Sequence, residues 1–301
     1  MKSFLRKNKL ALWLGVIFAI LFVGLIFSGL NYIKQHVIND HKEALKILAN
    51  EKASQVNMFL EFQKEKLLLL TSLDVFKEAI LHPDDASKLG VAKKVIDEFG
   101  GTASIFTNGG ILIYANNAPA GADYSGDPYF VQKDKKILFG RYYDMYEKKD
   151  FFIVIGPVYD SQEKDKAIGA IGFHIPLGDV GNIMKENLEE NNEEVYLIDE
   201  NGLLLSSSKY IGQGNKNGVL IQDVQSDGAK ACLDDLKKYQ ENGVIEEHKE
   251  EVKEYTNYMG DEVFGIHAYI PDIMGCVIAE ENAGDIPKFS ITGFIKNIFN
   301  K

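Results

Sequence analysis

The chain has 301 residues and a formal net charge of −11 at pH 7, with 46% hydrophobic and 26% charged residues. That composition is typical of globular proteins, and the length accommodates one large domain or two of ordinary size. Acidic residues are spread along the chain, whereas a nucleic-acid surface needs clustered Lys and Arg, so we expect no nucleic-acid partner.

The first element in chain order is an uncharged apolar segment, Leu10–Leu30. Its length matches the ~20 residues that cross a bilayer as a helix, whereas the apolar region of a secretory signal peptide is usually only ~7–15 residues long. A cut after Gly29 would also place the bulky Phe27 at the third position before it. We therefore expect residues 1–30 to form a cytoplasmic tip and an uncleaved, single-pass anchor in the cytoplasmic membrane. Four basic residues precede the span and predict a cytoplasmic N-terminus and an extracytoplasmic remainder: Lys2, Arg6, Lys7 and Lys9.

Residues 31–72 contain no Pro or Gly, and their apolar residues recur at helical spacing. A helix of this length rises about 60 Å, far more than a typical globular helix. Such a stalk packs either against a partner helix, which would make a homodimer, or along its own domain. The heptad pattern is imperfect, and both arrangements stay open. The apolar-face positions are Ile33, Val37, His41, Leu45, Leu48, Val56, Phe59, Leu60, Leu67 and Leu70.

Residues 73–180 predict two helices followed by an antiparallel sheet. The helical pattern breaks at His82-Pro83, after which Asp84 or Asp85 is placed to cap the next helix. A hairpin follows, with strands at 103–107 and 111–115 around Asn108-Gly109-Gly110. Beyond the loop DYSGDPYF, three runs rich in aromatic and β-branched residues predict consecutive strands: FGRYYDMY, FFIVIGPVYD and AIGAIGFHIPL.

Residues 181–287 partly repeat this plan, after a connecting helix at 177–192. Strands at 195–199 and 203–206 flank Asn201-Gly202, and a β-turn is favoured there over a calcium loop because the distal ligands are missing. A helix at 228–241 and strands at 243–249, 254–259, 263–270 and 274–280 follow. The class is α+β, with two tandem antiparallel-sheet modules. Residues 288–301 predict a short amphipathic tail, too short to span a bilayer.

Cys232 and Cys276 would lie in an oxidising compartment if this topology holds. They allow a single disulfide, but Cys276 sits in the strand-like run MGCVIA, where small buried thiols are common. The sequence leaves pairing open because it does not supply the Cα separation.

The order of these pieces over residues 31–287 resembles the double Cache family, the extracytoplasmic sensor modules of bacterial and archaeal receptors. The resemblance implies two PAS-like sheets on one long helix, with a small-molecule ligand, often an amino acid, amine or small carboxylate, in the membrane-distal module (73–180). The membrane-proximal module would be 181–287. The motifs that carry the resemblance are Asp123–Phe130, Arg141–Asp144, Val154–Asp160, Ile168–Leu177, the second hairpin with IDENG, and the runs AYIP and CVIAEE.

By that resemblance, Tyr124, Tyr129, Tyr142, Asp144 and His174 would line the ligand pocket. Two positions depart from the amino-acid-binding members of the family. Those members carry an Arg where this chain has Asp127, and an Asp where it has His174.

Asp127 is unable to hold a carboxylate as a guanidinium does, so the usual α-amino-acid ligand is not expected. Arg141 is the nearby cation, but strand alternation places it on the face opposite Tyr142. His174 is more often a hydrogen-bonded core residue than a ligand contact in such a strand, although its titration near neutrality would suit a pH-responsive pocket. If Asp127 paired with His174, the pocket would suit an uncharged or cationic solute.

No phosphate-binding loop, HExxH, CxxC or nucleophile elbow occurs, and His and Cys do not cluster at metal-ligand spacing. We therefore expect no enzyme, metal or cofactor. The sequence shows no output domain, which leaves two expectations open: a sensor that acts through a separate signalling protein, or a part of a longer receptor. The alternative function is an extracytoplasmic scaffold that binds a protein partner and no small molecule.

Overall fold

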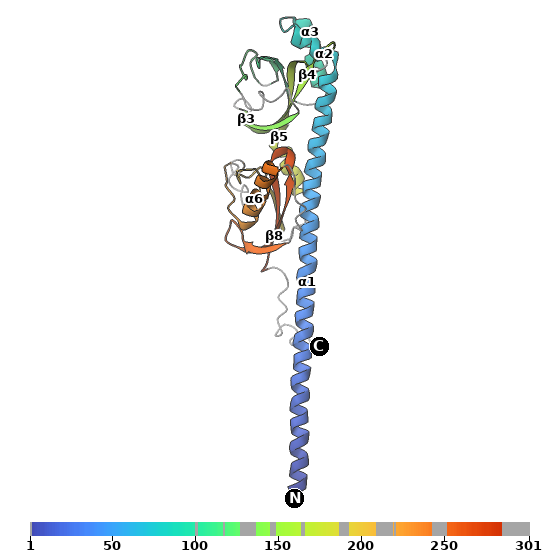
Figure 1. The fold of residues 1–301 in the computed structure, drawn as a ribbon, viewed down its shortest axis with the longest axis vertical. Coiled ribbons are helices and arrows are strands. Elements are labelled where there is room, and N and C mark those ends of the chain that lie inside the picture. The colour runs from blue at the N-terminus through green and yellow to red at the C-terminus, as the bar shows by residue number, and fades with distance from the viewer. Residues whose placement is uncertain are drawn as a thin grey trace.

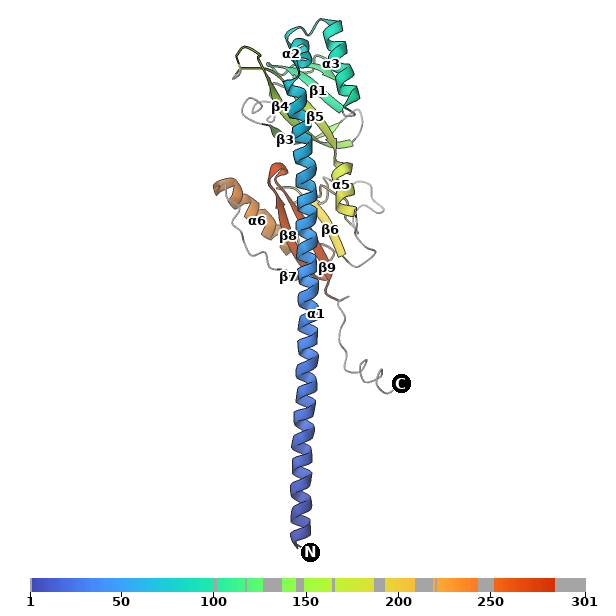
Figure 2. The ribbon, with the colours of Figure 1, turned by 90° about the vertical axis from the view of Figure 1, so that its right-hand side faces the viewer.

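The computed structural model describes residues 2–99, 102–116, 118–126, 137–144, 149–163, 166–186, 193–208, 219, 221–242 and 252–284. A single long helix carries two antiparallel sheets stacked along one side of it (Figures 1 and 2). The chain is thus α+β with two tandem sheets, as the sequence predicts.

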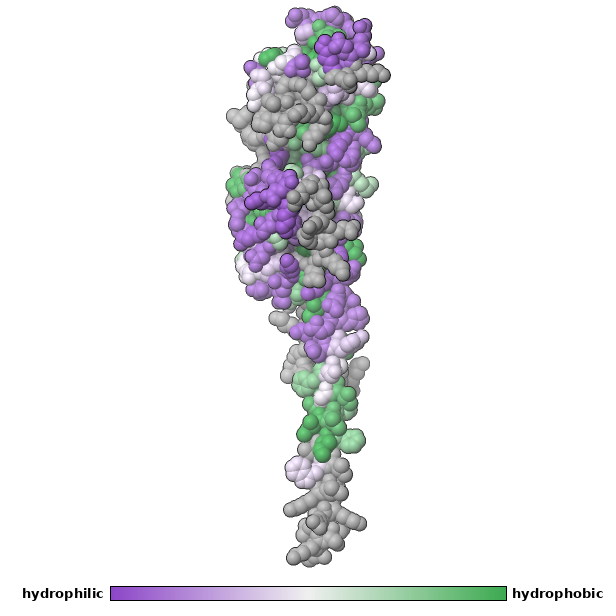
Figure 3. Space-filling model, in the orientation of Figure 1, coloured by the Kyte–Doolittle hydropathy of each residue, from purple (hydrophilic) through white to green (hydrophobic). Residues whose placement is uncertain are grey.

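Helix α1 runs without a break over Lys2–Ser72, 71 residues, so the predicted anchor and the predicted stalk are one helix. Its part from Ile20 onward is long and apolar enough to cross a membrane. Figure 3 shows hydrophobic side chains on the helix below the two sheets, and Phe18, Phe22 and Leu25 are exposed there. Such an unpacked apolar surface is unusual in water and matches a bilayer-facing segment.

Two short helices close the end of α1 that is remote from the N-terminus: α2 (Asp74–Leu81) and α3 (Ala86–Glu98). The break between them falls at His82-Pro83, as predicted. Of the two candidate caps, Asp85 is the N-cap, because its Oδ1 accepts hydrogen bonds from the backbone N–H groups of Ser87 and Lys88 at 3.0 and 3.3 Å.

The first sheet has the strand order β2-β1-β5-β4-β3 and is antiparallel throughout. The predicted hairpin is confirmed, with Gly110 at φ +87° in its turn, a conformation that suits glycine. The strands are β1 (Thr102–Thr107), β2 (Leu112–Ala115), β3 (Leu138–Asp144), β4 (Lys149–Tyr159) and β5 (Ala167–Pro176).

Helix α5 (Leu177–Lys185) leads into the second sheet, whose strand order is β6-β9-β8-β7. Helix α6 (Asp227–Asn242) packs on the face of this sheet that is remote from α1. The strands are β6 (Glu193–Ile198), β7 (Lys253–Thr256), β8 (Glu262–Ile270) and β9 (Gly275–Asn282), and the 3₁₀ turn η1 (Pro271–Ile273) joins the last two.

The predicted strand at 203–206 is wrong: Leu203 and Leu204 make only isolated bridges, to Asp223 and Ile198. The predicted turn before it is correct, since Asp199 accepts the backbone N–H groups of Asn201 and Leu203 at 2.8 Å each. These side-chain hydrogen bonds compete with the backbone hydrogen bonds of a strand pair and favour a turn. The predicted strand at 243–249 and the tail at 288–301 lie outside the described residues.

Cys232 and Cys276 form a disulfide with their Cα atoms 6.4 Å apart. The bridge joins α6 to β9 and sits in the core between them, where both half-cystines are fully buried. It settles the pairing that the sequence leaves open and accords with an oxidising compartment.

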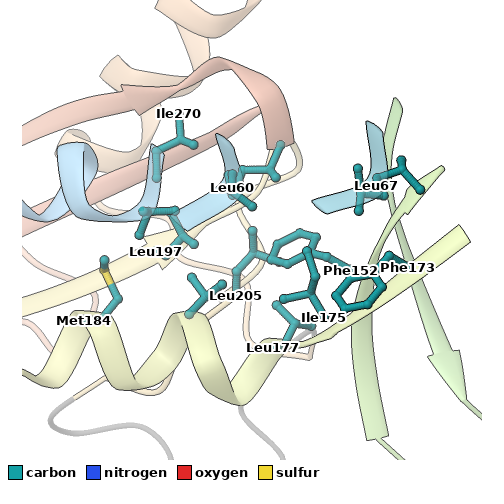
Figure 4. Close-up of a cluster of buried hydrophobic side chains, with 14 of the residues drawn as sticks. Leu60, Leu67, Phe152, Phe173, Ile175, Leu177, Met184, Leu197, Leu205 and Ile270 are labelled. Atoms are coloured by element: carbon teal, nitrogen blue, oxygen red, sulfur yellow. The ribbon is translucent and has the colours of Figure 1, made fainter. Parts of the chain in front are cut away.

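One face of α1 is buried against both sheets and forms a continuous core with them. Figure 4 shows Leu60 and Leu67 of α1 near side chains from the first sheet and from the second. The positions recur at spacings of three, four and seven residues, as expected of a helix stripe facing a core. The buried apolar residues of α1 are Leu45, Ala49, Ala53, Val56, Leu60, Leu67 and Leu70.

Lys52 interrupts this stripe with a charge, although its side chain is almost fully buried. Its Nζ donates to the backbone carbonyl of Ile183 at 2.7 Å and to that of Glu186. These carbonyls belong to the last turn of α5, where a cation also complements the helix dipole. Burial lowers the pKa of Lys52. The lysine thereby ties the segment between the two sheets to α1.

A second tie between the sheets comes from Arg141 of β3, which contacts Asp199 and Glu200 in the turn after β6. The Nη2–Glu200 distance is 2.8 Å, and the side chain of Asp199 is fully buried. Lys64 of α1 reaches Asp272 of η1 at 2.6 Å beside this contact. The two sheets therefore meet through charged groups as well as through the shared helix.

Leu67 and Leu68 offer a matched test of the shared core, because they are neighbours in α1 with 0% and 55% of their surface exposed. Leu67→Ala should lower the free energy of unfolding by about 2–5 kcal/mol. Leu68→Ala should change it by less than ~0.5 kcal/mol. Urea unfolding of the purified chain, followed by circular dichroism, measures both. Equal effects would contradict the assigned burial.

Arg141→Gln should destabilise the chain on the order of 3 kcal/mol, because it leaves the buried carboxylate of Asp199 without its guanidinium. Adding Asp199→Asn should restore part of that loss, since the amide oxygen keeps the turn hydrogen bonds and removes the unpaired charge. The same unfolding measurement compares the single and double variants. A double variant no more stable than Arg141→Gln would show that the ion pair does not hold the sheets.

Candidate ligand-binding site

Strand alternation gives the first sheet two different faces. The face toward α1 is packed with apolar side chains that belong to the shared core, among them Ala103, Ile105, Phe152, Val154 and Phe173. The other face carries the intervening residues, including Phe106, Ile155 and Ala170, which form a small separate apolar cluster with Leu112. This second face is the candidate site, since it lies away from the helix and carries polar groups as well.

The polar centre of this face is a pair of buried side chains, His174 of β5 and Ser104 of β1. The His174 Nε2 and Ser104 Oγ atoms lie 2.8 Å apart and are hydrogen bonded. Register places Ser104 opposite Gly172, so the two side chains meet diagonally across adjacent strands. Phe151 of β4 packs edge-on to the imidazole with ring centroids 6.2 Å apart.

Residues 118–126 fold over one edge of this face. Three backbone hydrogen bonds hold them to the hairpin: Gly121 N to Leu112 O at 2.8 Å, Leu112 N to Ala122 O at 2.9 Å, and Tyr124 N to Gly110 O at 2.9 Å. The result is that the Tyr124 ring meets Phe106 edge-on at 5.5 Å.

The side chain of Asp123 folds back within the same segment and accepts the Ser125 N–H at 2.8 Å. That backbone hydrogen bond holds the pKa of Asp123 below its usual value.

Of the predicted site residues, the structure places Tyr124 and His174 on this one face, Tyr124 against Phe106 and His174 against Ser104. Tyr142 and Asp144 lie in β3, where the backbone register sets them opposite Phe151 and Lys149. Asp127 and Tyr129, and with them the predicted pair between Asp127 and His174, fall outside the described residues.

Three residues of the site were missed by sequence reasoning: Ser104, Phe106 and Phe151. The run Ala103–Phe106 already alternates between small or aliphatic residues and Ser or Phe, which assigns Ser104 and Phe106 to one face. The strand-pair register that brings them to His174 is not visible in the sequence.

Arg141 lies on the α1 side of β3, where register sets it opposite Phe152. It is engaged with Asp199 and Glu200 as described above, in agreement with the face predicted for it by strand alternation. Arg141 therefore contributes to holding β3 rather than to the candidate site.

Two open grooves lie elsewhere on the surface. One, of about 780 Å³, runs between the end of α1 and the edge of β4, past Leu68, Pro157 and Tyr159. The other, of about 600 Å³, lies beside α1 at Met58, Phe62 and Tyr269. Among the described residues that line these grooves, neither Tyr124 nor His174 is present.

The fold was compared with solved structures, because no family model and no curated protein matches the chain. The ligand-binding domain of the Campylobacter jejuni chemoreceptor Tlp3, in complex with L-valine, aligns with a TM-score of 0.60 and 16% identity, covering 85% of this chain and 98% of that one. The sensor domain of the Vibrio cholerae histidine kinase DctB aligns with a TM-score of 0.59 and 11% identity, over 82% and 98% of the two chains.

A third similar structure is the ligand-binding domain of the Pseudomonas aeruginosa PAO1 amino-acid chemoreceptor PctC, in complex with GABA. It aligns with a TM-score of 0.57 and 12% identity, over 80% of this chain and all of the other. At these identities the likeness concerns the fold. The chain has the fold of the double Cache sensor domains of chemoreceptors and histidine kinases.

Proposed function

We propose that this protein is a membrane-anchored extracytoplasmic sensor that binds a small molecule on the face of the first sheet remote from α1. The observation that carries the proposal is the buried His174–Ser104 pair among aromatic side chains on that face. Convergent polar groups in an otherwise apolar, aromatic environment are typical of small-molecule sites. The similar domains of Tlp3 and PctC, whose structures contain L-valine and GABA, support the same use of the fold.

The proposed ligand is an uncharged or cationic metabolite, such as an amine, with an apolar part. Ser104 and His174 provide a hydroxyl and an imidazole for orientation, and Phe106 and Phe151 provide apolar rings. We assign six residues to the site on the basis of the sequence: Tyr124, Asp127, Tyr129, Tyr142, Asp144 and His174. The carboxylates of Asp127 and Asp144 favour a cation over an α-carboxylate.

The anchor would be the apolar part of α1, with residues 73–180 as the membrane-distal module and 181–287 as the membrane-proximal one. Exposed apolar side chains on α1 below the sheets support this arrangement (Figure 3). The basic residues before the span favour a cytoplasmic N-terminus. A separate signalling protein would respond to the conformational change caused by ligand binding.

Transmission would be a shift between two packings of the first sheet on α1. A ligand biases such an equilibrium only by binding one state better than the other. Strand β3 is placed to report the change, because it borders the proposed site and also carries Arg141, which contacts the turn at Asp199 and Glu200.

A second copy of the chain is the proposed partner of α1. The helix exposes large apolar side chains away from the core, and several recur at spacings of four, seven and eleven residues: Ile47, Met58, Phe62 and Leu69. Such a stripe is typical of a helix that packs on another helix.

Ligand binding is tested by melting the purified full chain in detergent with a panel of amines, amino acids, carboxylates and nucleobases. A ligand at 100 times its Kd should stabilise the chain by about 2.7 kcal/mol and raise the Tm. Tyr124→Ala should weaken binding roughly tenfold, about 1.4 kcal/mol.

Tyr159→Ala is the matched control, because Tyr159 and Tyr124 are 37% and 38% exposed and both flank the first sheet. It should leave the Kd unchanged. If Tyr159→Ala lost binding and Tyr124→Ala kept it, the ligand site would instead be the groove beside β4. No Tm rise with any compound would favour the scaffold function.

Self-association is tested with Phe62→Glu, which puts a charge into the exposed stripe of α1. If the chain is dimeric through this helix, the variant should be monomeric by light scattering at concentrations where the wild type is a dimer. Ile221→Glu, at an exposed apolar residue outside α1, is the control. A wild-type chain that is monomeric over the same range would rule out the helix contact.

A further inference from the structure

The second sheet also carries buried polar groups on its face remote from α1. Glu194 of β6 and Glu280 of β9 are direct cross-strand neighbours, and both side chains are almost fully buried. Their sequence neighbours Val195 and Ala279 pack toward α1 in the shared core, so the two carboxylates face the other way. Two adjacent buried acids are costly unless something compensates their charge.

Three tyrosines surround the two carboxylates. The hydroxyls of Tyr196 and Tyr255 both donate to Glu280 Oε1, at 2.9 and 2.7 Å. The hydroxyl of Tyr258 donates to Glu194 Oε1 at 2.5 Å. The Tyr196 and Tyr258 rings meet edge-on at 5.5 Å, so aromatic surface and carboxylate oxygens lie together.

The position of Tyr255 is fixed by two glycines. A Cβ atom at Gly228 of α6 or at Gly265 of β8 would lie 2.2 or 2.1 Å from the Tyr255 hydroxyl oxygen. A side chain at either position would require the Tyr255 ring to move. Glycine at both positions leaves room for the ring, whose hydroxyl contacts Glu280.

One oxygen of this cluster has its hydrogen-bonding capacity unused. Within the described part of the chain, Oε2 of Glu280 is buried and has no hydrogen-bond partner, while Oε1 receives two hydroxyls. Buried carboxylate oxygens in folded proteins are nearly always paired, so an unpaired one calls for an explanation such as a bound group.

The surroundings of Glu280 are predominantly negative. Burial and the neighbouring Glu194 raise the pKa of Glu280 to about 7, against the opposing effect of the tyrosine hydroxyls and of the Asn257 side chain. Asp227, at the start of α6, adds negative charge near Tyr255, and Lys253 lies exposed on the edge strand β7.

We propose that Glu194, Glu280, Tyr196, Tyr255 and Tyr258 form a second binding site, for a small protonated amine. An ammonium group brings the N–H donors that carboxylate oxygens lack, and tyrosine faces attract a cation. A divalent metal suits the cluster less well, because Ca²⁺ takes six to eight oxygen ligands. The described residues contain no group of three His, Cys, Asp or Glu side chains placed to hold a metal ion.

This site is independent of the proposed site on the first sheet, which uses different strands and residues. It would allow the chain to respond to two solutes, one on each sheet. The amine would neutralise the pair of acids and so stabilise the second sheet where α6 and β9 are already joined by the disulfide.

The test is calorimetric titration of the purified full chain with ethylammonium chloride near pH 7, with NaCl as the ionic-strength control. Glu280→Gln should weaken binding about tenfold or more, because it removes the charge that the ammonium contacts. Glu254→Gln removes the same charge from an exposed position on neighbouring β7 and should leave the Kd unchanged. Titrations in buffers of different ionisation enthalpy should reveal proton release, since the bound cation displaces the proton from Glu280.

Tyr124→Ala, the variant of the first-sheet site, should leave ethylammonium binding intact. If it abolished this binding instead, the amine would occupy the first sheet, and the second site would be refuted while the proposed function stood. Retained amine binding with no ligand for the first sheet would support the second site and count against the first.

The competing explanation for the two buried acids is that a proton, and no bound amine, neutralises the Glu194–Glu280 pair. The folded chain would then keep the Glu280 proton up to about pH 7 while the unfolded chain loses it near pH 4.5, so stability would fall as pH rises between these values. Glu280→Gln would flatten that decline in Tm. If the Tm of the wild type declined with rising pH and the wild type bound no ethylammonium, the amine site would be refuted.

Discussion

The inner faces of both sheets in this protein are covered by one unbroken helix. The sheets make few contacts with each other apart from charged groups, and each is completed by packing its inner face on the buried side of α1. A four- or five-stranded sheet exposes too much apolar surface to be stable without such a cover. The fold therefore requires a rigid helix that is long enough to reach past both sheets.

This requirement also determines where function can lie. Because α1 occupies one face of each sheet, alternate residues along the central strands belong to the shared core, and the others are left for the opposite face. In the first sheet those residues include Ser104, Phe106 and His174, and in the second they include Glu194, Tyr196 and Glu280. The helix that packs on both sheets also contains the apolar segment, so a change in sheet packing acts on the helix that carries this segment.

Much of this architecture follows from local sequence signals. His82-Pro83, the cap at Asp85 and the Asn108-Gly109-Gly110 turn each act over a few residues, so the helix break and the hairpin are readable from the sequence alone. The uninterrupted run of α1 over residues 31–72 also follows from the absence of Pro and Gly there. The strand expected at 203–206 failed because Asp199 offers nearby N–H groups a local acceptor that the strand pattern does not reveal.

The two proposed sites are less predictable from the sequence, because strand pairing brings together residues that lie far apart in the chain. Family-like motifs predict Tyr124 and His174 as site residues, but Ser104 meets His174 only through the β1–β5 register. Glu194 and Glu280 are separated by most of the second sheet, and in sequence each looks like an ordinary exposed acid. The same holds for Cys232 and Cys276, whose pairing depends on how α6 lies on β9.

Hydrogen–deuterium exchange of the full chain, with and without a metabolite that raises its Tm, tests the central claim most directly. The sensor account predicts that protection on binding is concentrated in residues 102–126 and 149–176, with weaker changes along the part of α1 that packs on them. Protection confined to the exposed side of α1, or to the groove beside β4, would contradict a ligand site on the outer face of the first sheet.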